Sequence, residues 1–127
     1  MKKQQKIWIA IPALNEAEWL PATIDAVRDQ DYQNYEIVVC VNQPDEFSSS
    51  DKSEEKDIFD NNRLTLEYLQ KQEDIPLHIL DKSSLDKGWK DGKGSVGAAR
   101  KYLMDYIAEQ GNAEDIILSM DADTLFG

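Results

Sequence analysis

The sequence predicts an α/β fold in which a mostly parallel sheet lies between two layers of helices. Short apolar runs rich in β-branched residues alternate along the chain with segments of helical periodicity. Four such runs and three helical segments follow one another, which is the order of consecutive β-α-β units. The 127 residues are enough for one domain, and a chain of this size buries roughly two thirds of its extended surface on folding.

The expected strands are apolar runs with no helical period. They cover residues 7–11, 35–41, 77–80 and 116–120. Between the second strand and the second helix, residues 43–57 are rich in Ser, Asp, Glu and Lys and have no periodicity, which predicts a loop.

The expected helices have inward stripes of apolar and small residues. The first is expected to start with Asn15 as N-cap and Glu18 completing a capping box. The second is expected over residues 58–70, and the third opens within residues 93–100 and stops at Gly111. The predicted inward residues are Ala17, Leu20, Ile24 and Val27, then Ile58, Asn62, Thr65, Leu66 and Leu69, then Val96, Ala99, Leu103 and Ile107.

The composition and charge of the chain argue against nucleic acid as a partner. The net charge of −11 and pI of 4.4 argue against nucleic acid, because phosphate backbones are bound by clustered Lys and Arg. The only cysteine, Cys40, lies in an apolar run, so we expect no intrachain disulfide and a cytoplasmic location. The only histidine, His78, is expected to be structural. No apolar stretch predicts a signal peptide or a membrane span.

The best candidate site lies where two strands end. In an open parallel sheet, ligands bind at the carboxyl ends of the strands, beside the point where strand order reverses. With the order 3-2-1-4, that point lies between the first and fourth strands, which are followed by residues 12–16 and by Asp121-Ala122-Asp123. Two carboxylates two residues apart can reach one cation, and oxygen ligands favour Mg²⁺ or Mn²⁺. The five-residue apolar run before Asp121 predicts that this pair lies at a buried strand end.

The start of the third helix is the second part of the candidate site. Lys93, Gly94 and Arg100 combine positive charge with small residues and free N–H groups, which favours a phosphate. The small residues are equally compatible with close packing of the helix on the sheet.

Taken together, these segments resemble the family-2 glycosyltransferases, whose fold is called GT-A. The motifs that carry the resemblance are Ile9-Ala10-Ile11-Pro12-Ala13-Leu14-Asn15-Glu16, Tyr35-Glu36-Ile37-Val38-Val39-Cys40-Val41-Asn42, Lys93-Gly94 with Ala98-Ala99-Arg100, and Asp121-Ala122-Asp123. Their order and spacing span essentially the whole chain. The resemblance implies that residues 1–127 form one Rossmann-like, nucleotide-sugar-binding domain.

The resemblance also implies roles for individual residues. Pro12, Leu14 and Glu16 would border the nucleoside, and Asn42 would lie near the base or ribose. The donor side would be lined by Lys93, Gly94 and Arg100. Asp121 would contact the ribose or the metal, and Asp123 would ligate Mn²⁺ or Mg²⁺ on the diphosphate of a UDP- or GDP-linked sugar. The resemblance does not indicate which acceptor would receive the sugar.

Two departures from the family qualify this expectation. The family often has an acidic pair after the second strand, where this chain has Val41-Asn42-Gln43-Pro44, so the base preference stays open. Inverting members take their general base from the acceptor-binding half, downstream of the Asp-x-Asp motif. We therefore expect the base beyond Gly127 and a fragment that binds donor but transfers sugar poorly or not at all.

Two other readings remain open. Asp121-Ala122-Asp123-Thr124 after an apolar strand also resembles the opening motif of haloacid-dehalogenase-type phosphatases, in which the first Asp is the nucleophile. In that family the motif follows the first strand, and residues 12–16 would have no role. The other reading is a non-enzymatic α/β binding module, which predicts no metal-dependent nucleotide binding.

Overall fold

A computed structural model describes residues 5–90, 92 and 96–121 of the chain, with the side chain of Val96 left out. The elements follow in the order β1 (Ile7–Ala13), α1 (Leu20–Asp29), β2 (Tyr35–Asn42), the 3-10 helix η1 (Asp45–Ser49), α2 (Ser53–Gln70), β3 (Leu77–Lys82), α3 (Val96–Gln110) and β4 (Ile116–Ser119). The four strands form one parallel sheet of order β3-β2-β1-β4. The predicted fold class and strand order are confirmed.

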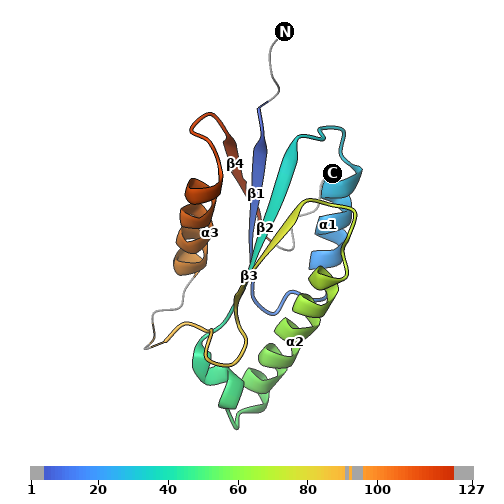
Figure 1. Cartoon of the computed structure of the whole chain (residues 1–127). Coiled ribbons are helices and arrows are strands. Elements are labelled where there is room, and N and C mark those ends of the chain that lie inside the picture. Colours follow the sequence, from blue (N-terminus) through green and yellow to red (C-terminus); the bar gives the residue numbers. More distant parts are fainter. Residues whose placement is uncertain (1–4, 91, 93–95, 122–127) are drawn as a thin grey trace.

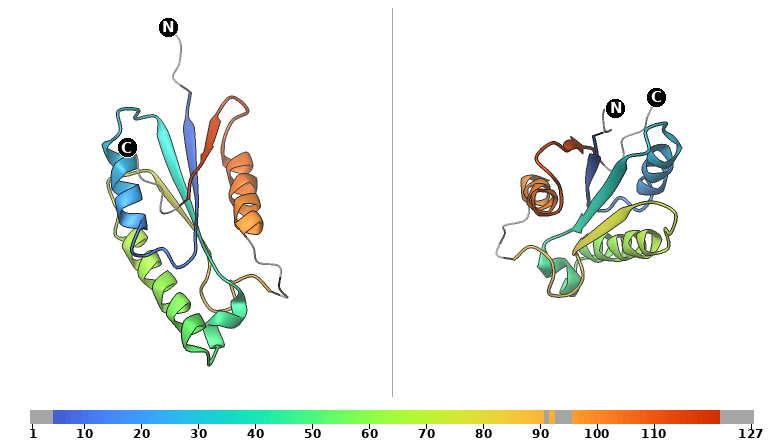
Figure 2. Two further views of the ribbon diagram at one scale, coloured as in Figure 1. Left: turned by 180° about the vertical axis from the view of Figure 1, so that it is seen from behind. Right: turned by 45° about the horizontal axis from the view of Figure 1, so that its top comes forward.

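The helices cover the two faces of the sheet unequally. Helices α1 and α2 lie on one face and α3 lies on the other (Figures 1 and 2). The side chains of β1 and β2 alternate between the two layers, as strand geometry requires. Ile9, Ile37 and Val39 point to the α1/α2 layer, whereas Trp8 and Val38 point to α3. Both faces of the two central strands are therefore buried, which explains their continuous apolar sequence.

Cys40 belongs to the α3 side of this core. Its side chain is 0% exposed and packs in the cluster that includes Leu103 and Ile107. Burial raises the pKa of the thiol to about 12. Cys40 is therefore a core residue.

Pro12 lies within β1 even though proline is unusual in a central strand. The carbonyl of Ala10 accepts a hydrogen bond from the backbone N–H of Met120, so Ala10 faces β4. Because strand backbone groups alternate in direction, Pro12 faces the same side, beyond the last β1–β4 pair, Ala10 with Ser119. No ladder bond is lost there, and β1 and β4 part at Pro12.

The predicted start of the first helix is wrong. Helix α1 begins at Leu20 with Trp19 at the N-cap position and no side-chain cap. Asn15 instead has a φ of 59°, the left-handed conformation that asparagine tolerates better than most residues. Ala17 therefore lies outside the helix, although the predicted inward residues Leu20, Ile24 and Val27 are all buried.

The predicted loop between β2 and the second helix is shorter than expected. It contains η1, and α2 begins at Ser53 rather than at residue 58. The acidic residues of the first helical turn, Glu54 and Glu55, favour an early start because they complement the positive end of the helix dipole. Four of the predicted inward residues are buried, namely Asn62, Thr65, Leu66 and Leu69, whereas Ile58 is half-buried.

Strand β4 is more exposed than its apolar sequence predicts. Ile116, Ile117 and Leu118 are 42–44% exposed because β4 is an edge strand of the sheet. The prediction of a buried fourth strand is therefore wrong for residues 116–118, whereas Met120, directly before Asp121, is buried. None of the helices in the described part of the chain combines the length and apolar character that a membrane crossing requires.

A polar network ties β2 and β3 to α3 near the amino ends of the strands. Glu36 accepts hydrogen bonds from the ammonium of Lys6 at 2.6 Å and pairs with Nε2 of His78 at 2.7 Å. The other ring nitrogen of His78 lies 2.8 Å from the hydroxyl of Tyr106 on α3. Burial alone would raise the pKa of the Glu36 carboxyl, but the bonds from Lys6 and His78 outweigh it and lower the pKa. His78 is thus engaged within the fold, as predicted.

The Glu36 network predicts a pH-dependent loss of stability. We expect Glu36→Gln to lower the free energy of unfolding at pH 7 by about 1.5–3 kcal/mol, the range for hydrogen bonds to a charged group. The pKa of the Glu36 carboxyl in the folded state lies below its ordinary value of 4.5. The charged carboxylate therefore stabilises the fold fully above about pH 4.5, and this stabilisation is lost as the pH falls through the folded-state pKa. Urea unfolding should therefore show the gap between parent and variant narrowing below about pH 4.5.

The control is Glu109→Gln, which changes an exposed carboxylate on α3. Its stability should stay within about 0.5 kcal/mol of the parent at pH 7. A gap for Glu36→Gln that is as large in acid as at pH 7 would contradict the prediction.

Candidate active site at the carboxyl edge of the sheet

The reversal of strand order between β1 and β4 places two polar strand ends at the same edge of the sheet. β1 leads into Leu14 and Glu16, of which Leu14 is exposed and Glu16 half-buried. β4 leads through buried Met120 into exposed Asp121. The β1–β4 pairing ends at Ala10 and Ser119, so both segments leave the ladder at the position where open parallel sheets bind ligands.

Arg100 and Asp121 meet at this point. One guanidinium nitrogen of Arg100 donates to Oδ1 of Asp121 at 2.9 Å. The two side chains are 47% and 63% exposed, so the pair contributes little to stability. The charge of Asp121 is thus balanced by an arginine in this structure, and its carboxylate faces solvent, where the sequence predicted a buried position. Two residues predicted for the site from distant parts of the chain are in direct contact.

Two asparagine side chains of α2 accept hydrogen bonds from the backbone of the loop between β1 and α1. The backbone N–H of Asn15 donates to Oδ1 of Asn62 and that of Ala17 donates to Oδ1 of Asn61, both at 2.9 Å. At the other end of the loop, the carbonyl of Glu16 accepts from the first residues of α1. Neighbouring asparagines of one helix therefore hold the segment that includes Leu14 and Glu16.

Asn42 lies at the carboxyl edge of the sheet, but its side chain is already hydrogen-bonded to other residues of the protein. It is 5% exposed, and its Nδ2 donates to the carbonyls of Ala13 at 3.1 Å and Cys40 at 3.4 Å. Its Oδ1 accepts from the indole N–H of Trp89 at 3.1 Å. A direct contact with a base or ribose stays a prediction; the observed contacts tie β2 to the end of β1 and to Trp89.

The segment around Trp89 approaches the exit of β2 very closely. The backbone N–H of Trp89 donates to the carbonyl of Gln43 at 2.9 Å, and its carbonyl accepts from the N–H of Asp45 at 2.8 Å. Gly88 makes this approach possible, because a Cβ there would lie 2.6 Å from Cα of Asp45. The backbone contact therefore requires glycine at this position.

Asp81 organises the turn that leads to Trp89. Its carboxylate accepts hydrogen bonds from the backbone N–H and hydroxyl groups of Ser83 and Ser84, at 2.5–3.0 Å. Burial would raise the pKa of this carboxyl, but the bonds from Ser84 and Ser83 outweigh it and lower the pKa. Asp81 is thus a charged cap for the turn.

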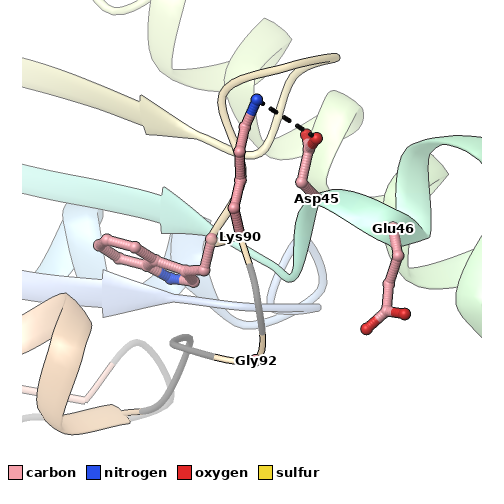
Figure 3. A pocket seen from close by; sticks show the side chains of 5 residues that line it. Asp45, Glu46, Lys90 and Gly92 are labelled. Carbon is pink, nitrogen blue, oxygen red and sulfur yellow. Dashed lines mark ion pairs between the residues drawn. The ribbon is translucent and has the colours of Figure 1, made fainter.

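A pocket of about 420 Å³ opens beside this turn. It is lined by Asp45, Glu46, Trp89, Lys90 and Gly92. Asp45 turns toward the ammonium of Lys90, 3.9 Å away, whereas the side chain of Glu46 points away from it (Figure 3). The volume lies in the range of small-molecule sites. The acidic pair that follows Pro44 had no predicted role.

Trp89 also takes part in an aromatic and cationic cluster. Its ring meets that of Tyr102 edge to face at 5.8 Å, and the ammonium of Lys82 lies 4.9 Å from the Trp89 ring and 5.4 Å from the Tyr102 ring. These contacts fix the tryptophan between β3 and α3. Trp89 is therefore both a packing anchor and a wall of the pocket.

Three residues predicted for the site, Lys93, Gly94 and Asp123, lie outside the described residues. Within the described part of the chain, no group of three or more His, Cys, Asp or Glu side chains is arranged to hold a metal ion. The predicted pairing of Asp123 with Asp121 therefore stays a prediction.

The architecture is Rossmann-like. The all-parallel sheet of order 3-2-1-4 with helices on both faces matches the Rossmann-like half of the GT-A fold. A family model described as glycosyl transferase family 2 matches residues 8–55. No curated protein matched the chain. This match over residues 8–55 confirms the resemblance to family-2 glycosyltransferases predicted from the sequence and supports glycosyl transfer as the general activity.

The matched segment covers β1, α1, β2, η1 and the first turn of α2. It includes Pro12, Leu14, Glu16 and Asn42. It ends well before Arg100 and Asp121, so the roles of these two residues rest on the strand order and on their contact.

The close approach at Gly88 gives a testable prediction. Gly88→Ala should lower the free energy of unfolding by about 1–3 kcal/mol, the usual cost of inserting a methyl group where packing leaves no room. The backbone atoms of Asp45 and Gln43 cannot rotate away as a flexible side chain could. The measurement is urea unfolding at neutral pH.

Lys87→Ala is the matched control, because it changes the neighbouring exposed residue, whose ammonium lies 3.8 Å from Asp81. It should shift stability by at most about 1 kcal/mol. If Gly88→Ala were as stable as Lys87→Ala, the strict need for glycine would be wrong.

Proposed function

We propose that this chain acts as one domain that binds the nucleoside-diphosphate sugar of a glycosyltransferase, UDP- or GDP-linked, at the carboxyl edge of its sheet. The diphosphate would lie at the β1–β4 crevice, and the nucleoside would lie between residues 12–16 and the exits of β2 and β3. The proposal covers donor binding and assigns neither an acceptor nor a general base.

The contact between Arg100 and Asp121 is the observation that carries this proposal. It brings a cation and a carboxylate together at the crevice, the two charges that a metal-bound diphosphate requires. Both side chains are exposed, so each can exchange its present partner for a ligand at small cost. On donor binding, Arg100 would pair with phosphate oxygens and Asp121 would be released toward the cation.

Asp121 fits the ligand chemistry of Mn²⁺ or Mg²⁺. Its Oδ1 is engaged by Arg100, and within the described residues its Oδ2 has no hydrogen-bond or ion-pair partner. Asp123 would supply the second carboxylate. When bound, the cation would act as a Lewis acid that stabilises the charge growing on the departing nucleoside diphosphate.

The acidic net charge of the chain does not oppose this proposal. Exposed charges are screened beyond about 8 Å at physiological salt, so the groups beside the ligand decide its binding. Arg100 is one local cation, and Lys90 contributes a second at the pocket beside Trp89. Lys93 is expected to add a third.

The proposal is tested by thermal unfolding with Mn²⁺ and either UDP or GDP. A ligand at about one hundred times its dissociation constant should stabilise the folded state by about 2.7 kcal/mol. The stabilisation should require both the metal and the nucleotide, and Asp123→Asn should remove it. The nucleotide that gives the larger shift identifies the donor class.

Asp105→Asn serves as the control for a lost surface carboxylate, because Asp105 pairs only with Lys101 on the exposed side of α3. This variant should keep the full ligand-dependent shift. A cooperatively folded parent whose unfolding midpoint does not move with either nucleotide and Mn²⁺ would overturn the proposal.

A further inference from the structure

A chain of buried polar side chains runs behind the ends of β1 and β2. It begins at Asn62 on α2, which is 0% exposed. Oδ1 of Asn62 accepts from the backbone N–H of Asn15 at 2.9 Å, and its Nδ2 donates to Oε1 of Gln43 at 2.8 Å and to the carbonyl of Asn42 at 3.3 Å. One side chain therefore links α2, the loop after β1 and the end of β2.

The chain continues from Asn42 to the pocket. Asn42 donates to the carbonyl of Ala13 and accepts from the indole N–H of Trp89, both at 3.1 Å. Trp89 lines the 420 Å³ pocket. The side chains of Asn62, Asn42 and Trp89, here called the buried relay, thus connect the loop after β1 with the pocket wall.

The direction of each hydrogen bond in the relay is fixed by its partners. A backbone N–H and an indole N–H can only donate, so Oδ1 of Asn62 and Oδ1 of Asn42 must face Asn15 and Trp89. Gln43 cannot be turned around, because its Nε2 would then face the donor Nδ2 of Asn62. Removing the Asn62 side chain therefore removes the acceptor for the N–H of Asn15 and the donor to Oε1 of Gln43.

The relay holds a backbone conformation that few residues adopt. Asn15 has a φ of 59°, which asparagine tolerates better than most residues, and the hydrogen bond from its N–H to Asn62 fixes the loop in this conformation. Asn62 lies on the inward stripe of α2 beside Leu66 and Leu69, where an apolar side chain would satisfy packing alone. An amide at this position also makes directional hydrogen bonds, which hold the loop after β1 at a defined place relative to β2.

We propose that Asn62 is a positioning residue for donor binding. It lies behind the loop rather than in the crevice, and through Asn15 and Asn42 it fixes the loop after β1 and the Trp89 wall relative to each other. This inference rests on the proposed function, because the placement of these two walls matters for activity only if a donor binds between them.

The test compares two buried positions of α2. Asn62→Ala removes the relay, whereas Thr65→Ala removes a hydroxyl that is equally buried and bonds only to the helix carbonyl of Asn61. Stability is measured by urea unfolding, and nucleotide affinity by calorimetric titration of UDP or GDP with Mn²⁺ under conditions where each variant is folded. We expect Asn62→Ala to weaken affinity about tenfold and Thr65→Ala to leave it within about twofold.

Hydrogen exchange of the Asn15 amide supplies a readout that needs no nucleotide. The amide should be protected in the parent and in Thr65→Ala, and should lose protection in Asn62→Ala. If protection is lost but affinity stays as in Thr65→Ala, Asn62 has only a structural role and the positioning proposal is overturned. If the parent binds no nucleotide, the proposed function fails and the positioning role fails with it, even where the exchange result matches expectation.

Trp89→Phe tests the far end of the relay and keeps the proposal falsifiable if Asn62→Ala does not fold. It removes the indole N–H but keeps an aromatic ring in the wall. We expect weaker nucleotide binding and faster exchange at Asn15, although Trp89 does not contact that residue. With both single variants folded, the double variant should weaken affinity by less than the product of the two single effects. Unchanged Asn15 exchange in Trp89→Phe, or fully multiplicative effects, would overturn the coupling.

Discussion

The site depends on the central position of β1 and on the point where its pairing with β4 ends. As far as Ala10, β1 is bonded to strands on both sides and its side chains are covered by helices on both faces. At Pro12 the chain has no N–H to offer on the β4 side, and the two strands separate. Pro12 therefore marks the point beyond which β1 and β4 are no longer paired, on the side of the sheet where Asp121 follows β4. The loop directly follows this firmly held strand, so the position of the loop is set before any ligand binds.

The strands and the sheet order could be predicted because burial on both faces leaves a plain signature in the sequence. The continuous apolar runs of β1 and β2 have that signature, and alternation with helices leaves few topologies for a parallel sheet. The start of α1 was wrong because asparagine favours both N-caps and left-handed turns, and Asn15 takes the second option. The exposure of β4 was not predicted, because its apolar run suggested burial on both faces even though the predicted strand order already placed it at an edge.

The candidate site was predictable in part for a similar reason. Strand order alone brings the ends of β1 and β4 together, and the Arg100–Asp121 contact follows from that order and from the direction of α3. The relay was not predicted because it joins residues 19 to 47 positions apart through side-chain hydrogen bonds that no periodic pattern encodes. One signal was available: Asn62 is a fully polar residue on an inward stripe, and a buried amide requires partners. Gly88 gave no comparable signal.

The buried state of Cys40 has a practical consequence for studying this molecule in solution. Maleimides and iodoacetamides react with the thiolate, which needs both access to solvent and a pKa near the working pH. Cys40 has neither, since its side chain is enclosed and burial raises its pKa to about 12. A cysteine introduced at an exposed position of the loop after β1, such as Leu14, would therefore take up a fluorophore or spin label selectively. The movement of that loop could then be followed from one label, without first removing the native thiol from the core.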